Sequence, residues 1–188
     1  IHETGIHYAR LEITDHPITY DDALFFTFEV KKQIPLLAIH NGQESPYLHL
    51  LFDNDSSFIF KTVAESQLDY SSFNQFNLII INGLNIISSG LSLELKRFVE
   101  GGGSVVVFPG EMADLESYRQ FFQQMGTSFF AEKTEGETKV SGINTLNRVY
   151  DDVFENVPEN IDLPAVSGHY VIRRKPGSLM ESLLEMQN

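Results

Sequence analysis

The feature that most constrains the fold is a series of short apolar runs that alternate with amphipathic helical patterns from residue 33 onward. The run at 34–39 is continuously apolar, which is typical of a strand buried on both faces of a sheet. The largely apolar segments at 76–81 and 104–108 predict two more strands, the second of them also buried. A further strand is expected at 58–63. Helical patterns occupy 46–52, 91–99 and 114–125. Strands joined in this way by helices and short links predict an α/β fold around a parallel sheet.

The helix boundaries carry recognisable signals. Ser45 and Pro46 stand where an N-cap residue and a first-turn proline are expected. The glycines at 101–103 and Gly126 stand where the second and third helices should end, since a helix often ends at a residue with positive φ. The buried stripe of the second helix is predicted to be Leu91, Leu95, Phe98 and Val99, and that of the third Leu115, Tyr118, Phe122 and Met125.

The two ends of the chain differ from this middle part. Residues 5–13 and 23–30 are rich in β-forming side chains and predict two strands, which cannot form a stable domain alone. After residue 127 the signal weakens. There we expect a short strand at 128–131, a charged turn at 133–139, a last strand at 169–173 and a helical run at 178–187.

Composition excludes several classes of function. There are 13 Lys and Arg against 26 Asp and Glu, so the net charge is −13, which disfavours binding to nucleic acid or anionic membranes. Cysteine is absent, and with it thiol catalysis, disulfides and cysteine-ligated metals. The six histidines lack a metal-binding spacing, and residues 53–57 begin like a calcium loop but lack its glycine and glutamate. We therefore expect no metal and no cofactor.

Polar residues follow the predicted strands at the edge where ligands bind in open parallel sheets. A crevice there would contain His40, Asn41, Asn82, Asn85 and Glu111. The competing interpretation is that these are ordinary turn residues, because Asn-Gly and Pro-Gly form turns by conformation alone. We find this second interpretation the stronger on sequence grounds.

Residues 76–126 resemble the core of the class I glutamine amidotransferase-like fold. The likeness rests on NLIIING at 77–83, LKRFVEGGG at 95–103 and VVVFPG at 105–110. In active members of that family a G-x-C-x-G elbow presents a nucleophilic cysteine. Here Phe108 takes the cysteine's place ahead of Gly110, and Val106 stands where the first glycine should be. The resemblance therefore implies a three-layer fold, flavodoxin-like or amidotransferase-like, with a degenerate site.

A longer resemblance, over about residues 5–184, is to bacterial BatA-like (aerotolerance regulator-type) membrane proteins. It implies that residues 1–30 are closing strands of an Ig-like β module and that 31–188 are a C-terminally truncated amidotransferase-like domain. The parent protein would be anchored in the bacterial inner membrane with this part in the periplasm. The start at Ile1 and the helical run expected near Asn188 fit a fragment of such a protein.

The function expected from these patterns is a non-catalytic interaction domain whose partners are proteins, in a membrane-associated complex. Two alternatives stay open. One is a cysteine-independent hydrolase or transferase with His40 and Glu111 as its acid–base pair. The other is a module that binds a small ligand or sugar through Asn41, Asn82 and Asn85.

Overall fold

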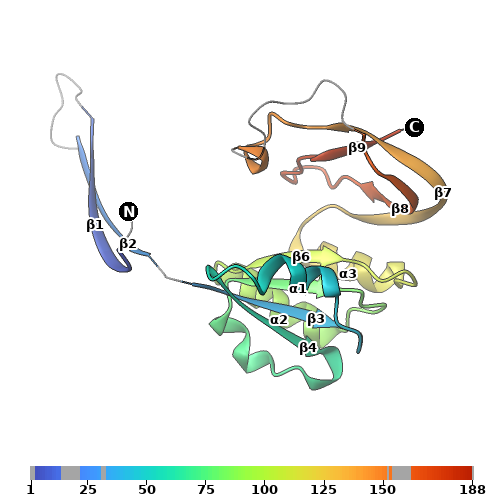
Figure 1. The fold of residues 1–188 in the computed structure, drawn as a ribbon, viewed down its shortest axis with the longest axis horizontal. Helices are drawn as coiled ribbons and strands as arrows, with labels where there is room; N and C mark the ends of the chain where they lie inside the picture. Colours follow the sequence, from blue (N-terminus) through green and yellow to red (C-terminus); the bar gives the residue numbers. More distant parts are fainter. Residues whose placement is uncertain (1–2, 14–21, 31–32, 152, 154–161, 188) are drawn as a thin grey trace. The chain divides into compact units, whose positions relative to one another are not determined.

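The computed structural model describes residues 3–13, 22–30, 33–151, 153 and 162–187 (Figure 1). The chain divides into two compact units. The first consists of Ile1–Asn82 and Gly101–Phe108, and the second of Gly83–Glu100 and Pro109–Asn188. Each unit is described by itself below.

The first unit contains the predicted parallel sheet, with strand order β4-β3-β5-β6. Its strands are β3 (Ile34–His40), β4 (Phe58–Ala64), β5 (Leu78–Asn82) and β6 (Ser104–Phe108). The two central strands, β3 and β5, carry the most buried side chains, as their apolar runs predicted; four examples are Leu36, Ile39, Ile79 and Ile81. The parallel sheet expected from the sequence is confirmed.

The edge strand β6 is less buried than predicted. Its side chains alternate between half-buried and exposed, and Val106 is 38% exposed. Among the described residues β6 pairs only with β5, so it lies at the edge of this sheet. A run of three valines was therefore wrongly interpreted as a strand buried on both faces.

Helix α1 (Pro46–Phe52) packs on one face of this sheet. Leu48 forms a core cluster with Ala38 of β3 and Ile80 of β5, and Phe52 packs against the same cluster. Ser45 is the N-cap residue as predicted, although its side chain makes no capping hydrogen bond. Two short 3-10 turns, η1 (Glu65–Gln67) and η2 (Tyr70–Gln75), lead from β4 to β5.

The N-terminal strands form an antiparallel hairpin of β1 (Gly5–Glu12) and β2 (Ala23–Val30), in which Gly5 pairs with Val30 (Figure 1). Both predicted strands are confirmed. Their connection, which contains Asp15 and Asp21, lies outside the described residues. One face of the hairpin is apolar, because Ala9 and Leu11 are paired with Phe26 and Leu24.

In the second unit, α2 (Ser89–Glu100) and α3 (Leu115–Met125) are the predicted helices. Helix α3 ends at Gly126, which has φ +77° as expected. The predicted stripes need correction: Val99 of α2 is 38% exposed, and α3 buries Phe121 at 1% exposure instead of centring on Phe122. The 3.6-residue periodicity locates the apolar face of a helix. Whether a side chain at the border of that face is buried depends on the elements that pack against it.

The rest of the second unit is an antiparallel sheet of order β8-β7-β9 (Figure 1, orange to red). Its strands are β7 (Phe129–Ile143), β8 (Ala165–Arg173) and β9 (Leu184–Met186), with a 3-10 turn η3 (Arg148–Tyr150) between the first two. The predicted turn at 133–139 is wrong, because β7 continues through it. The predicted helix at 178–187 is also wrong, because Met186 pairs with Val140 of β7.

The chain therefore has a mixed α/β fold with a four-stranded parallel sheet. The alternation of strands and helices ends with α3, and residues 129–186 continue as antiparallel structure instead. Within the described residues, none of the helices has the length and apolar character needed to cross a bilayer.

Candidate functional site

The C-terminal edge of the parallel sheet brings three of the predicted residues into register. His40 of β3 is paired with Asn82 of β5, and Asn82 with Phe108 of β6. His40 is buried, with 6% of its surface exposed. The backbone N–H of Gly42 donates to His40 Nδ1 at 3.1 Å, which leaves the ring proton on Nε2 when the imidazole is neutral. Asn41, the next residue, is exposed.

Beside His40 lies a cluster of polar side chains that we call the Glu44 cluster: Glu44, His49, Asp53 and Thr62. Glu44 Oε2 is 3.1 Å from His49 Nε2, and Asp53 Oδ2 is 2.9 Å from His49 Nδ1. The hydroxyl of Thr62 donates to Glu44 Oε1 at 2.8 Å. Helix α1 explains part of this arrangement, since His49 and Asp53 are four residues apart and lie on one face.

These contacts change the proton affinities of the cluster. The hydrogen bond from Thr62, followed by that from His49, lowers the pKa of Glu44. The hydrogen bond to Asp53, followed by the one to Glu44, raises the pKa of His49. Both shifts favour the charged forms, the carboxylate of Glu44 and the imidazolium of His49. Sequence patterns missed this cluster, although the spacing of His49 and Asp53 on a predicted helix could have indicated the pair.

The cluster has limited chemical capability. His40 Nε2 is 3.9 Å from Glu44 Oε1, which is beyond hydrogen-bond distance. Among the described residues, no three His, Asp or Glu side chains are arranged to hold a metal ion. His40 belongs to the first unit and Glu111 to the second, so the acid–base pair expected from the sequence stays a prediction.

The turn after β6 is tightly packed around Gly110. A Cβ atom there would lie 2.5 Å from Asn85 Oδ1, 2.8 Å from Gly83 O and 3.0 Å from Leu84 O. The backbone N–H of Gly110 donates to Leu84 O at 3.2 Å. Only glycine allows this close approach of two backbone segments. Asn85, which the sequence placed in a possible crevice, lies against Gly110 in this turn.

Next to this turn is a cavity of about 600 Å³ that we call the elbow pocket. Its wall contains Pro109, Gly110, Glu111, Lys133, Glu135, Gly136, Ser167, Gly168, His169 and Tyr170. The hydroxyl of Tyr170 donates to Gly110 O at 2.7 Å, and Lys133 Nζ donates to Glu111 O at 2.8 Å. These two bonds fix β7 and β8 to the elbow.

Of the predicted site residues, Gly110 and Glu111 line the elbow pocket. His40, Asn41, Asn82 and Phe108 belong to the first unit, with Phe108 49% exposed at the end of β6. Sequence analysis missed Lys133 and Tyr170. Lys133 fell in a segment expected to be a turn, and only the register of β7 with β8, where Lys133 pairs with Tyr170, brings the two together.

At the level of sequence, no protein-family model and no curated protein matches this chain. A solved structure of a protein described as ThuA-like, from Bacteroides uniformis ATCC 8492, is similar in fold, with a TM-score of 0.51 and 15% identity. The match covers 79% of this chain and spans 65% of that one. This likeness is one of fold, and it supports the amidotransferase-like α/β fold expected from the sequence. At the amidotransferase-like elbow, Phe108 replaces the nucleophile that the resemblance would require.

Proposed function

We propose that this chain is a non-catalytic interaction domain of amidotransferase-like fold, in the extracytoplasmic part of a membrane-anchored BatA-like protein. The same proposal includes a three-layer arrangement, with helices on both faces of the parallel sheet. It also includes the assignment of β1 and β2 as closing strands of an Ig-like module. The exposed apolar face of that hairpin, which includes Leu24 at 59% and Phe26 at 45% exposure, supports this last part.

The observation that carries the proposal is the chemistry of the elbow. Phe108 has no nucleophilic atom, and Val106 removes the glycine that precedes the thiol in the family's motif. Asn85 and the backbone of residues 83 and 84 fill the space around Gly110. The elbow is therefore a packed turn that holds two backbone segments together, and Phe108 supplies it with no nucleophile.

A surface for protein contact is present on α1. Tyr47, Leu50 and Leu51 are 79%, 71% and 63% exposed and are spaced at i, i+3 and i+4, so they form one outward face. The inward face of the same helix is formed by Leu48 and Phe52. Helix α1 is therefore apolar on two faces, of which only the inner one packs on the sheet. Exposed apolar patches of this kind mark interaction sites.

The residues around this α1 face indicate the chemistry of the partner. Glu44 precedes the helix, and Asp53 and Asp55 follow it, all exposed. Together with the net charge of −13, they favour a partner whose apolar patch is bordered by Lys and Arg. We expect the association to weaken as salt is raised, since exposed charges are screened within about 10 Å at 0.1 M ionic strength.

Site-specific photo-crosslinking tests this function. A photoreactive residue at Tyr47 or Leu51 should give one discrete crosslinked adduct in cells that express the full-length protein. The same residue at Lys96, on the polar side of α2, is the matched control and should give none. Equal adducts from all three positions, or none from any, would contradict the proposal.

A second candidate is binding of a small polar ligand in the elbow pocket, which its volume and its mixture of Lys133, Glu111 and Glu135 favour. A thermal-shift screen with monosaccharides and amino acids tests it. A ligand at 100 times its dissociation constant adds about 2.7 kcal/mol to the free energy of unfolding. The stabilisation should disappear in Lys133→Gln and persist in Lys96→Gln; no stabilisation by any compound would exclude these two ligand classes.

A further inference from the structure

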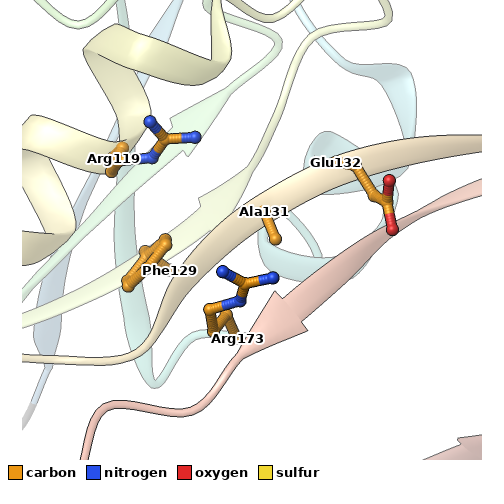
Figure 2. A pocket seen from close by; sticks show the side chains of 5 residues that line it. All are labelled: Arg119, Phe129, Ala131, Glu132 and Arg173. Carbon is orange, nitrogen blue, oxygen red and sulfur yellow. The ribbon is translucent and has the colours of Figure 1, made fainter.

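A second cavity in the second unit is lined by two arginines. It has a volume of about 330 Å³, and its wall consists of Arg119, Phe129, Ala131, Glu132 and Arg173 (Figure 2). Arg119 comes from α3, Arg173 from the end of β8, and the other three from the start of β7. Two cations gathered in one pocket are unexpected in a chain with 13 Lys and Arg against 26 Asp and Glu.

The register of β7 and β8 explains why these side chains converge. Phe129 is paired with Arg173, and Phe130 with Ile172, but Glu132 is paired with Val171. Ala131 is thus the extra residue of a β-bulge. A bulge shifts the side-chain alternation by one, so Glu132 joins Phe129 and Arg173 on the same face of the sheet.

The opposite face of the same strands carries other contacts. Phe130 stacks on Tyr170, with ring centroids 4.9 Å apart, and Lys133 of this face lines the elbow pocket. The arginine-lined pocket is therefore separate from the elbow pocket, and it needs its own explanation.

Arg119 is held in a defined position but is not fully satisfied. Its Nη1 donates to Glu116 Oε2 at 2.9 Å, and its guanidinium lies 5.8 Å from the ring centroid of Phe129. Its Nε–H is buried and has no hydrogen-bond partner among the described residues. A buried donor without an acceptor is costly, so this position of Arg119 leaves one hydrogen bond unmet.

Arg173 is exposed and pairs with no acidic side chain within the described part of the chain. The carboxylate of Glu132 lies on the side of the pocket away from Arg119 in Figure 2. Arg119 thus keeps an unsatisfied Nε–H, and the guanidinium N–H groups of Arg173 pair with no carboxylate among the described residues. Phe129, next to both, supplies an apolar wall.

We propose that this pocket binds the carboxylate or phosphate group of a small organic ligand between Arg119 and Arg173, with the ring or chain of the ligand against Phe129. Guanidinium groups are suited to both anions because their planar N–H pairs match two oxygens at once. Glu132, at the border of the pocket, would disfavour ligands with several negative charges.

Titrations followed by 15N NMR test the proposal, with phenyl phosphate, benzoate and inorganic phosphate as probes and the 188-residue chain as the sample. We expect saturable shifts of the Arg119 Nε–H signal and of the amides of residues 129–132 and 173 with at least one aromatic anion. The anion that saturates at the lower concentration identifies the preferred group. Shifts that rise linearly without saturation, or are shared by all arginines, would overturn the proposal.

Variants locate the site. Arg119→Gln and Arg173→Gln should each raise the dissociation constant by about tenfold or more, the effect of losing one charge-assisted hydrogen bond. Arg97→Gln, which removes the same charge from the exposed Arg97–Glu94 pair on α2, is the control and should leave affinity unchanged. Glu132→Gln should tighten binding. If Arg119→Gln disturbs folding, Arg173→Gln decides alone, because that side chain is exposed; equal weakening in Arg97→Gln would contradict a specific site.

Discussion

At the scale of single residues, Gly110 is the position where the elbow tolerates least change. Replacing Gly110 by alanine forces a Cβ against two backbone oxygens, at 2.8 and 3.0 Å, which cannot move as a flexible side chain can. We expect a loss of about 1–3 kcal/mol in the free energy of unfolding, as for other overpacked sites. Urea denaturation of the purified variant measures it.

Gly142→Ala is the control for this substitution. A Cβ at Gly142 would meet only the carboxylate of Glu185 at 4.0 Å, which is ordinary contact. We expect its stability to stay close to that of the unchanged chain. Equal losses in both variants would mean that the crowding at Gly110 relaxes and that the elbow is not a packed turn.

His49 provides a prediction about proton affinity. Its largest stabilising partner is Asp53, so Asp53→Asn should lower the pKa of His49 toward the ordinary value of about 6.5. Titration of the His49 ring signals by NMR measures the shift. Asp55→Asn is the control, because Asp55 accepts from the Ser57 backbone and does not contact His49. An unchanged His49 pKa in Asp53→Asn would show that the 2.9 Å contact does not persist in solution.

The same shifts set the pH range in which the Glu44 cluster stabilises the fold. The pKa of His49 is raised on folding, so its contribution is complete below about 6.5 and is lost as pH rises through the folded value. The pKa of Glu44 is lowered, so its contribution is complete above about 4.5 and is lost as pH falls through the folded value. The difference in stability between the unchanged chain and Asp53→Asn should therefore shrink as pH rises above 6.5.

At the scale of elements, helix α3 shows which features the periodicity of apolar residues can predict and which it cannot. The sequence located the helix, its end at Gly126 and the buried Tyr118, but it selected Phe122 for the core where the structure buries Phe121. Phe121→Ala should cost about 3–5 kcal/mol, the usual loss for a fully buried phenylalanine. Met125→Ala, at a half-buried position of the predicted stripe, should cost clearly less.

Denaturation curves of the two variants measure the difference. A loss in Met125→Ala as large as that in Phe121→Ala would support the stripe predicted from the sequence and contradict the packing in the structure. The comparison is informative because both residues lie on the same helix and share its propensity for helix formation.

The strands of the antiparallel sheet show why local patterns fail. Residues 132–137 of β7 are exposed on both faces, so they lack the alternation of apolar and polar side chains that predicts a strand. Their structure depends on backbone pairing with β8, whose partner residues are about thirty or more positions away, as Lys133 with Tyr170 shows. Strand β9, only three residues long, depends on β7 in the same way. Long-range pairing overrides local propensity in such segments.

At the scale of the whole molecule, the parallel sheet was predictable because its central strands are apolar over most of their length and helical patterns alternate with the strands. The candidate site was predictable only in part. Gly110 and Glu111 follow a strand of that sheet and were identified, whereas Lys133 and Glu135 of the elbow pocket come from the part of β7 that the sequence predicted to be a turn. A site built partly from a turn after a parallel strand and partly from antiparallel strands can therefore be predicted only in part from the sequence.

The absence of cysteine gives the last prediction. If the missing thiol were the only defect of the elbow, Phe108→Cys would restore hydrolysis of glutamine. We expect no activity in either the unchanged chain or Phe108→Cys, because Val106 occupies the position of the glycine that precedes the thiol. A thiol alone also lacks the adjacent general base that activates such nucleophiles. Ammonia release from glutamine measures the rate. Saturable hydrolysis by the unchanged chain would contradict the proposed non-catalytic function. Activity in Phe108→Cys alone would mean that the elbow keeps the geometry of an enzyme that lost only its nucleophile.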